Sequence, residues 1–363
     1  MAKSTTKKVS FRSIALALAM IGGIGSAHTE ETKQLPVKLG MPSPVVQAIG
    51  AYYSSIPATL YWKDEGLDVK IENMNGANAA AEALSAGLLD VTLGASQALF
   101  NLEKARPGTA IGFYALINRF QDVTAVLADS KLNTVLDLQG KQIGVQSLAN
   151  TQGPVLKALI KQAGGDASNT QLVAVGDVAE AGFALQKGRV DAIAMADGQI
   201  AQIDAKGIKL KKITTPAMDL TKVGFGGAIF TRRDFLAKNR ETLVRLARGI
   251  AKASIFAKEN PEATIRIHWK FYPATKPRGV DDAEAMRMSL AALNARMENV
   301  EPAQNLWGFA TDDQIKSFVE LLVTSGALNE PMALDRFWTA DLVKDINNFD
   351  AEAVRKQARE YKD

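Results

Sequence analysis

The chain has 363 residues, 47% of them hydrophobic and 23% charged, with no cysteine and two histidines. These values are typical of a globular protein long enough for two domains, and they exclude a disordered or fibrous chain. The lack of cysteine excludes disulfides, catalytic or metal-binding thiolates, and the acylated cysteine of a bacterial lipoprotein. Because no clustered carboxylates or histidines replace them, we expect neither a metal nor a cofactor.

The N-terminal segment accounts for the net charge of +4. Residues 1–27 hold four basic residues and no acidic one, so the remainder has equal numbers of each. An apolar run over residues 14–21 leads to small residues ending at Ala27, a pattern typical of a secretory signal peptide cut there. The alternative is a membrane anchor, but the run is short for about 30 Å of hydrocarbon. We predict a signal peptide over residues 1–27, a periplasmic mature protein and no nucleic-acid partner.

Strand and helix patterns alternate along the chain until about residue 231, and helices follow. Alternating or buried apolar runs predict strands over residues 37–41, 67–71, 89–93, 110–117, 123–128, 142–145, 172–175, 191–196, 208–213 and 224–231. Helical periodicity predicts a helix from about residue 45 that is interrupted at Pro57, and further helices over residues 58–62, 77–86, 131–140, 155–163, 233–258, 281–299, 312–325 and 342–361.

The motif A-L-x-x-G-x-x-D occurs twice, at residues 83–90 and 184–191. In both copies an alanine-rich run precedes the motif and a short apolar run follows it, which indicates a helix, a glycine stop and a buried strand. Two such units predict two lobes of similar construction. Ser96 and Asp197 follow the two strands at equivalent positions. We therefore expect a hydroxyl at the end of the strand in one lobe and a carboxylate at the end of the equivalent strand in the other.

Polar residues gather where the expected strands end. Small residues before Ser96 and Gln97 allow a ligand to approach the backbone, and both side chains can form hydrogen bonds. The richest group precedes a helix and comprises Ser147, Asn150, Thr151 and Gln152. Free N–H groups at a helix start favour an anion. An ordinary N-cap, which needs only one of these side chains, is the alternative.

Several segments together resemble one family. In chain order they are M-P-S-P at 41–44, E-G-L-D-V at 65–69, the two repeats, the stretch 137–145 and T-D-D-Q-I at 311–315. Their order and spacing are similar to those of the periplasmic substrate-binding proteins of ABC importers for nitrate, sulfonates, taurine and thiamine-pyrimidine precursors, the NMT1-like family. The similarity covers residues 36–350.

The resemblance implies a type II periplasmic-binding-protein fold, with two similar α/β lobes, a ligand cleft between them and a helical C-terminal region. Lobe one would hold residues 36–122 and 228–350 with the C-terminal helices, lobe two residues 123–227, and residues 351–363 would form a tail. Ligand would lie between strand ends and helix starts of both lobes. The ligand-binding residues that the resemblance implies are Pro42, Ser43, Tyr52, Asn75, Ser96, Gln97, Asn118, Ser147, Asn150, Thr151, Asp197 and Phe225.

The implied function is binding and not catalysis. A monomer would capture a small organic anion or zwitterion, such as a sulfonate or carboxylate, and deliver it to an ABC permease and ATPase complex in the inner membrane. Arg119 is the obvious cationic candidate, whereas Asp177 and Asp197 would repel a pure anion if both face the cleft. The alternatives are a periplasmic ligand sensor and an enzyme like the pyrimidine synthases, whose active-site histidine and cysteine the candidate loops lack.

Overall fold

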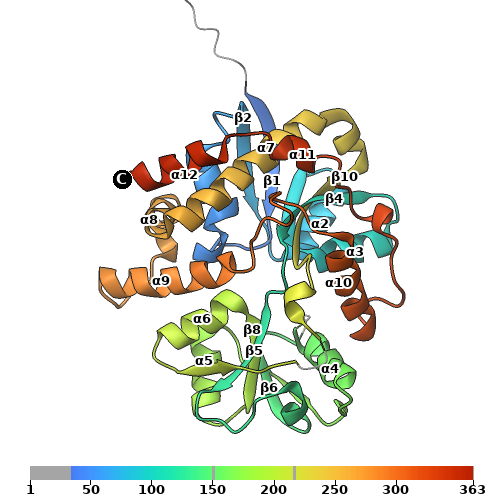
Figure 1. The fold of residues 1–363 in the computed structure, drawn as a ribbon, viewed down its shortest axis with the longest axis vertical. Helices are drawn as coiled ribbons and strands as arrows, with labels where there is room; N and C mark the ends of the chain where they lie inside the picture. The colour runs from blue at the N-terminus through green and yellow to red at the C-terminus, as the bar shows by residue number, and fades with distance from the viewer. Residues whose placement is uncertain (1–33, 149–151, 216–217, 363) are drawn as a thin grey trace, which may run out of the picture. The chain divides into compact units, whose positions relative to one another are not determined.

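Two five-stranded sheets organise the chain (Figure 1). The computed structural model describes residues 34–148, 152–215 and 218–362, so the predicted signal peptide lies outside the described residues. The first sheet has the order β2-β1-β3-β10-β4, with β1 Leu35–Met41, β2 Leu67–Asn73, β3 Val91–Ala95, β4 Ala110–Ile117 and β10 Gly227–Arg232. The second has the order β7-β6-β8-β5-β9, with β5 Asp122–Leu127, β6 Gln142–Val145, β7 Gln171–Ala174, β8 Ala192–Ala196 and β9 Leu210–Lys212.

The two sheets share one topology. In the first, β1 pairs in parallel with β2 and β3, and β10 lies antiparallel between β3 and β4. In the second, β6 pairs in parallel with β7 and β8, and β5 lies antiparallel between β8 and β9. The predicted two-lobed α/β fold is confirmed, and we use lobe one and lobe two for these sheets with the helices packed on them.

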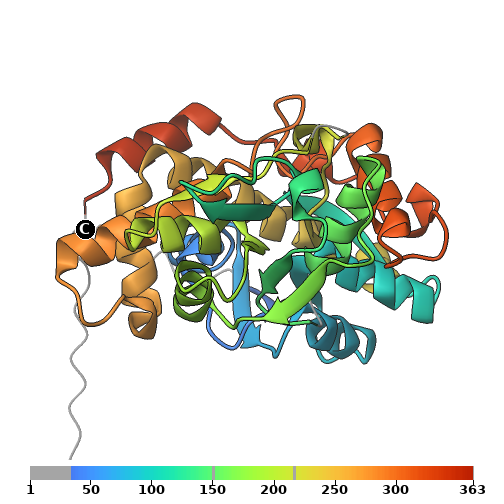
Figure 2. The same cartoon turned by 90° about the horizontal axis from the view of Figure 1, so that it is seen from below.

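Helices follow the strands of both lobes and form the C-terminal region. Lobe one has a 3-10 helix η1 Ala48–Tyr53, then α1 Ser55–Leu60, α2 Ala77–Ser85 and α3 Ser96–Ala105, and lobe two has α4 Gln152–Gln162, α5 Val178–Gln186 and α6 Asp197–Ala205. The C-terminal helices are α7 Arg233–Glu259, α8 Pro261–Phe271, α9 Asp282–Met297, α10 Asp312–Thr324, α11 Val343–Ile346 and α12 Ala351–Glu360. Figures 1 and 2 show α12 beside α7, and its Val354 and Ala358 are buried in the same core cluster as α7.

Three helix predictions were wrong in detail. Pro57 does not interrupt a helix but lies in the first turn of α1, where its missing N–H costs no hydrogen bond. The expected helix over 342–361 is divided, because Asp350 caps a new helix by accepting from the Ala353 N–H at 3.0 Å. The expected helix over 131–140 is only a 3-10 turn, η2 Val135–Leu138, and α8 was not predicted at all.

The two motif copies form the same structure in both lobes. Gly87 and Gly188 adopt φ of 76° and 64° after their helices, a left-handed conformation that favours glycine. The aspartates then start the strands: Asp90 Oδ2 accepts from the Lys38 N–H at 2.9 Å, and Asp191 Oδ2 accepts from the Gln142 N–H at 2.8 Å. Each motif therefore ends a helix and fixes the register of a neighbouring parallel strand.

Replacing Asp90 or Asp191 with alanine is expected to lower the free energy of unfolding by about 1 kcal/mol, since each change leaves a strand N–H without its acceptor. Urea denaturation measures the effect. Asp68→Ala is the matched control, because Asp68 is an exposed strand aspartate in β2. If either motif variant loses no more stability than the control, the register role is wrong.

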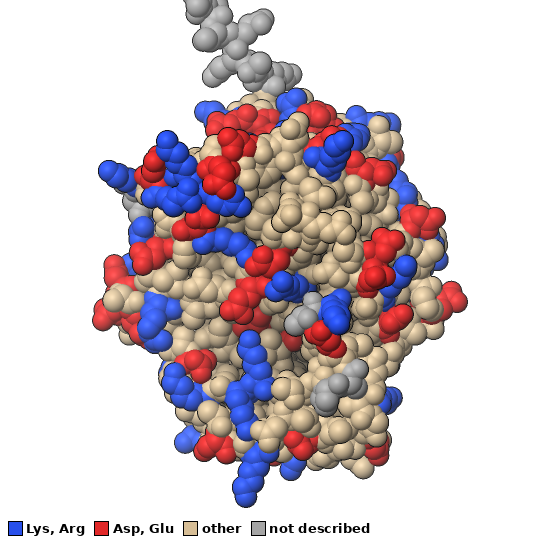
Figure 3. All heavy atoms as spheres, viewed as in Figure 1, with Lys and Arg blue, Asp and Glu red and all other residues tan. Residues whose placement is uncertain are grey.

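Charged side chains of both signs are interspersed on the face of the molecule shown in Figure 3. This mixture agrees with the equal numbers of basic and acidic residues after residue 27. Within the described ranges, the helices are too short or too polar for any of them to cross a membrane.

Candidate binding site

The chain crosses between the lobes twice, first between β4 and β5 and again between β9 and β10. Each crossing contacts the start of a helix. The Asp197 N–H, at the start of α6, donates to the Gln121 carbonyl in the first crossing at 2.9 Å. The Ser96 N–H, at the start of α3, donates to the Gly226 carbonyl in the second crossing at 3.3 Å. Ser96 and Asp197 thus occupy equivalent places in their lobes, beside the crossings.

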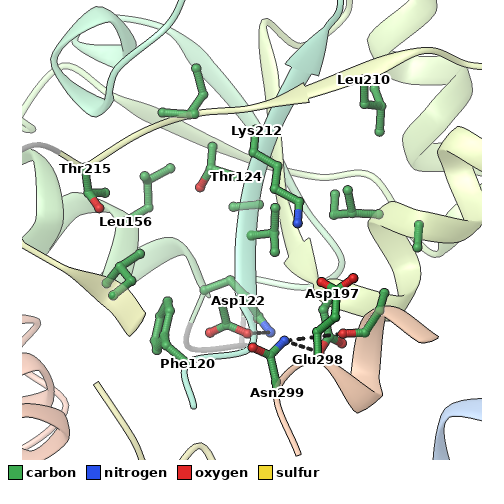
Figure 4. A pocket seen from close by; sticks show the side chains of 18 of the residues that line it. Phe120, Asp122, Thr124, Leu156, Asp197, Leu210, Lys212, Thr215, Glu298 and Asn299 are labelled. Atoms are coloured by element: carbon green, nitrogen blue, oxygen red, sulfur yellow. Dashed lines mark hydrogen bonds between the residues drawn. The ribbon is translucent and has the colours of Figure 1, made fainter. Parts of the chain in front are cut away.

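A cavity of about 640 Å³ lies against lobe two (Figure 4). Its walls come from β5, β8, β9, α4 and α6, from the two crossings, and from α9. The polar lining residues are Arg119, Asp122, Thr124, Gln152, Asp197, Asp204, Lys212, Thr215, Asn294, Glu298 and Asn299. The apolar lining residues are Phe120, Val123, Val135, Val155, Leu156, Leu159, Ala194, Ile200, Ala201, Leu210, Ile213, Leu220, Ala291 and Ala295. This size and mixed lining suit a small organic molecule.

Helix α9 joins the two lobes at this cavity. Its Leu293 and Met297 are buried in the core cluster that also contains β1 and α7 of lobe one. Another face of α9 packs along α6, where the Arg287 guanidinium donates to the Ala205 carbonyl. The cavity is therefore enclosed between lobe two and a helix that is anchored on lobe one.

A buried ion pair links α9 to the start of α6. Arg296 Nε lies 3.0 and 2.9 Å from the two Asp197 carboxylate oxygens, and its Nη2 lies 2.7 Å from Oδ1. Asn299 Nδ2 donates to Oδ2 at 2.8 Å, and the Gly198 N–H donates to Oδ1 at 2.6 Å. The two charged side chains are only 6% and 4% exposed. Burial lowers the pKa of Arg296, but the Asp197 carboxylate outweighs it and raises that pKa above its ordinary value.

A second carboxylate in the cavity lacks such a partner. Asp122, the first residue of β5, accepts from Gln152 Nε2 at 3.3 Å, and within the described residues it forms no ion pair. Burial raises the pKa of Asp122 to about 6, and the Gln152 hydrogen bond only partly opposes this shift. Asp122 is therefore a cavity carboxylate that still has capacity for a ligand; Asp204 and Glu298 also line the cavity.

Four buried polar atoms beside the crossings have no hydrogen-bond partner in the described part of the chain. They are Ser96 Oγ, Gln97 Oε1, Gln121 Oε1 and Gln152 Oε1. Gln152 also lines the cavity. Because a buried polar atom without a partner costs free energy, such a group next to a cavity indicates a place for a ligand or water.

The family model described as NMT1/THI5 like matches residues 58–264, more than half of the chain. The chain belongs to the NMT1/THI5-like family. The resemblance seen in the sequence is thereby confirmed. No curated protein sequence matches the chain.

Solved structures share the fold of this NMT1/THI5-like chain. The periplasmic aliphatic sulphonate binding protein SsuA from Escherichia coli has a TM-score of 0.62 at 17% identity, over 84% of this chain and 92% of that one. The alkanesulfonate-binding protein SsuA from Xanthomonas axonopodis pv. citri, bound to MOPS, has a TM-score of 0.59 at 15% identity, over 85% and 99%. The desulfurization enzyme DSZB has a TM-score of 0.52 at 14% identity, over 86% and 99%. The fold by itself therefore hosts both binding proteins and an enzyme.

The predicted residues of lobe one lie outside the cavity lining. Asn75 is exposed, Ser43 Oγ donates to the Val45 carbonyl at 2.7 Å, and Pro42 lies 3.3 Å from the place of a Cβ on Gly94. Ser96 and Gln97 are near the crossings and keep the unpartnered atoms described above. The structure brings none of these five into the cavity, so their role in binding stays a prediction.

Three predicted contact residues instead belong to the protein interior. Tyr52 is fully buried in the lobe one core, and its hydroxyl donates to the Leu116 carbonyl at 3.3 Å. Phe225 is also fully buried, packed edge-on against Trp338 with ring centres 5.0 Å apart. Asn118 is 4% exposed and pairs through both side-chain atoms with the backbone of Glu301. We correct these assignments: the aromatic rings are core, and the Asn118 amide is already satisfied.

The predicted residues of lobe two have mixed outcomes. Asp197 lines the cavity, although Arg296 neutralises it. Ser147 is half-buried outside the lining, and Asn150 and Thr151 lie outside the described residues. The sequence left open whether Arg119 and Asp177 face the cleft. Arg119 lines the cavity, whereas Asp177 is exposed and accepts from Gln199 Nε2 at 2.8 Å.

The sequence analysis missed most of the charged groups at the cavity. Asp122 directly precedes the run predicted as a strand over 123–128, and Lys212 lies in the run predicted as a strand over 208–213; neither was predicted as a site residue. Arg296 lies near the end of α9 and Asn299 lies two residues after that end, and their spacing does not indicate the partner that they share. The pairing of Arg296 with a residue 99 positions earlier has no local signal.

Of the two histidines, His268 lies in the part of the chain that the structure describes and is part of the core. His268 Nδ1 lies 3.0 Å from Ser55 Oγ, and both residues are fully buried, away from the cavity. Burial lowers the pKa of His268 to about 4, so the ring is neutral at pH 7. In the described ranges no cluster of side chains could hold a metal ion.

Proposed function

We propose that this protein is an extracytoplasmic solute-binding protein that captures a small organic anion or zwitterion between its lobes and delivers it to an ABC importer. The observation that carries the proposal is the cavity of about 640 Å³, which lobe two and α9 enclose together. Because its walls belong to both lobes, ligand contacts favour the arrangement in which the lobes are together.

The lining supports a solute with an apolar body and charged ends. Branched aliphatic side chains from β5, α4 and the segment after β9 form one wall, and Figure 4 shows Lys212 directed into the cavity from β9. Lys212 makes no ion pair with any residue that the structure describes, so its ammonium is available to an anionic group.

The partners follow from family membership and from the leader-like N-terminus. We propose that residues 1–27 are a signal peptide and that the exported protein hands its solute to a membrane complex. We propose an ABC permease and ATPase as that complex, with a monomeric binding protein in the periplasm. The sulfonate-binding proteins with this fold support the same assignment.

Ligand binding is tested by thermal shift over sulfonates, aromatic carboxylates, taurine and pyrimidines. We expect a probe at 100 times its dissociation constant to stabilise the protein by about 2.7 kcal/mol. Ala201→Phe, which fills the cavity from α6, should abolish the shift, while Ala179→Phe on the exposed face of α5 should keep it. If no probe shifts the transition, or if Ala201→Phe binds like the control, the proposal is wrong.

A further inference from the structure

We infer that Asp122 and Gln152 form a subsite for a protonated amine, so that the solute is a zwitterion and not a simple anion. This inference rests on the proposed function and names the class of solute that the cavity takes. The subsite consists of one carboxylate without a cation and one amide oxygen without a donor, and both residues line the cavity.

The Gln152 amide has a fixed orientation. Its Nε2 donates to Asp122 Oδ1 at 3.3 Å, and only the nitrogen of an amide can donate to a carboxylate. Oε1 therefore points away from Asp122, where it is buried without a partner in the described chain. A buried amide oxygen is satisfied by a donor, and a carboxylate or sulfonate has none to offer at neutral pH.

Asp197, which also lines the cavity, does not compete for this role. Asp197 already accepts from Arg296, Asn299 and the Gly198 N–H, and its charge is balanced by Arg296. Asp122 has no comparable partner, and its carboxylate lies beside the side chain of Gln152, the first residue of α4. A ligand anion there would meet Asp122, whereas a ligand ammonium would neutralise it.

A primary ammonium has three N–H donors, and the Asp122 carboxylate and Gln152 Oε1 supply acceptors for two of them. Lys212 then remains for the anionic end of the same solute.

The test uses probe pairs that differ only in the amine: taurine with ethanesulfonate, and 4-(aminomethyl)benzoate with 4-methylbenzoate. Titration calorimetry at pH 7.5 measures each affinity for the wild type, Asp122→Asn, Gln152→Met and the control Asp129→Asn. Asp129 is an exposed aspartate near the far end of β5. We expect the wild type and the control to prefer the amine-bearing member by about 10- to 100-fold, and Asp122→Asn and Gln152→Met to lose most of that preference.

The outcomes separate this inference from the proposed function. If the amine-free probes bind as tightly as their partners, or if Asp122→Asn keeps the preference, the amine subsite is wrong while the solute-binding function stands. If none of the four probes binds to the wild type, the amine subsite is contradicted, and the solute-binding function is contradicted only if the wider thermal-shift screen also finds no ligand. Melting curves of each variant without ligand establish that it is folded.

Discussion

Replacing Arg296 with methionine is expected to lower the free energy of unfolding by about 3–5 kcal/mol, the largest effect that we predict for a single side chain. The Asp197 carboxylate would keep only Asn299 and the Gly198 N–H, and its charge would stay buried without a cation. The bidentate geometry and the low exposure of both side chains make this loss larger than for a surface ion pair. Urea denaturation monitored by circular dichroism measures the effect.

Two further variants identify the cause. Arg359→Met, on α12, removes an exposed arginine and should cost less than about 1 kcal/mol. The double variant Asp197→Leu with Arg296→Met replaces the pair by apolar side chains and should recover most of the lost stability. A single Arg296→Met variant as stable as Arg359→Met would show that the pair does not hold α9 on α6.

The second large effect is a pH dependence of stability that originates at Asp122. The carboxyl pKa is raised from 3.8 to about 6 in the folded protein, mainly by burial, so the folded state binds more protons between these values. The free energy of unfolding therefore falls as the pH rises from about 4 to about 6, by about 2–3 kcal/mol. Asp122→Asn lacks this penalty and should be more stable than the wild type by that amount at pH 7, with little difference at pH 4.

His268 acts in the opposite direction over an overlapping range. Burial lowers its pKa from 6.5 to about 4, so the unfolded state binds the proton first and stability falls as the pH drops through this window. Because the wild type and Asp122→Asn share His268, the difference between them isolates Asp122. Unfolding of both proteins at pH 4, 5, 6 and 7 gives the comparison, with Asp129→Asn as the control. A difference that stays constant across this range would mean that Asp122 does not titrate as described.

These two predictions concern residues that sequence patterns do not reveal. Apolar periodicity and the duplicated motif predict both sheets and most helices, because strand alternation and the glycine stops are local properties. The site depends on long-range contacts instead. Arg296 meets Asp197 only because α9 returns to lobe two, and Phe225 is core because Trp338 covers it. Polar residues such as Ser96 and Ser147 were predicted as ligand contacts because of their chemistry, but the sequence does not reveal which residues surround them.

Asp122 also connects stability with binding. A carboxylate that is costly to ionise in the empty protein becomes favourable when a ligand ammonium neutralises it, so Asp122→Asn should gain stability and lose affinity together. A buried charge that destabilises the empty protein but contributes to binding is a common form of the trade-off between stability and function.

The order of the strands has a consequence for the folding of a chain that is delivered N-terminus first, as an exported chain is. All five strands of lobe two lie within residues 122–212, so that sheet is complete before β10 emerges. The lobe one sheet has a gap between β3 and β4 until Gly227–Arg232 arrives to fill it. Since a chain folds from the end that emerges first, we expect the lobe two sheet to be completed before the lobe one sheet, which has to wait for β10.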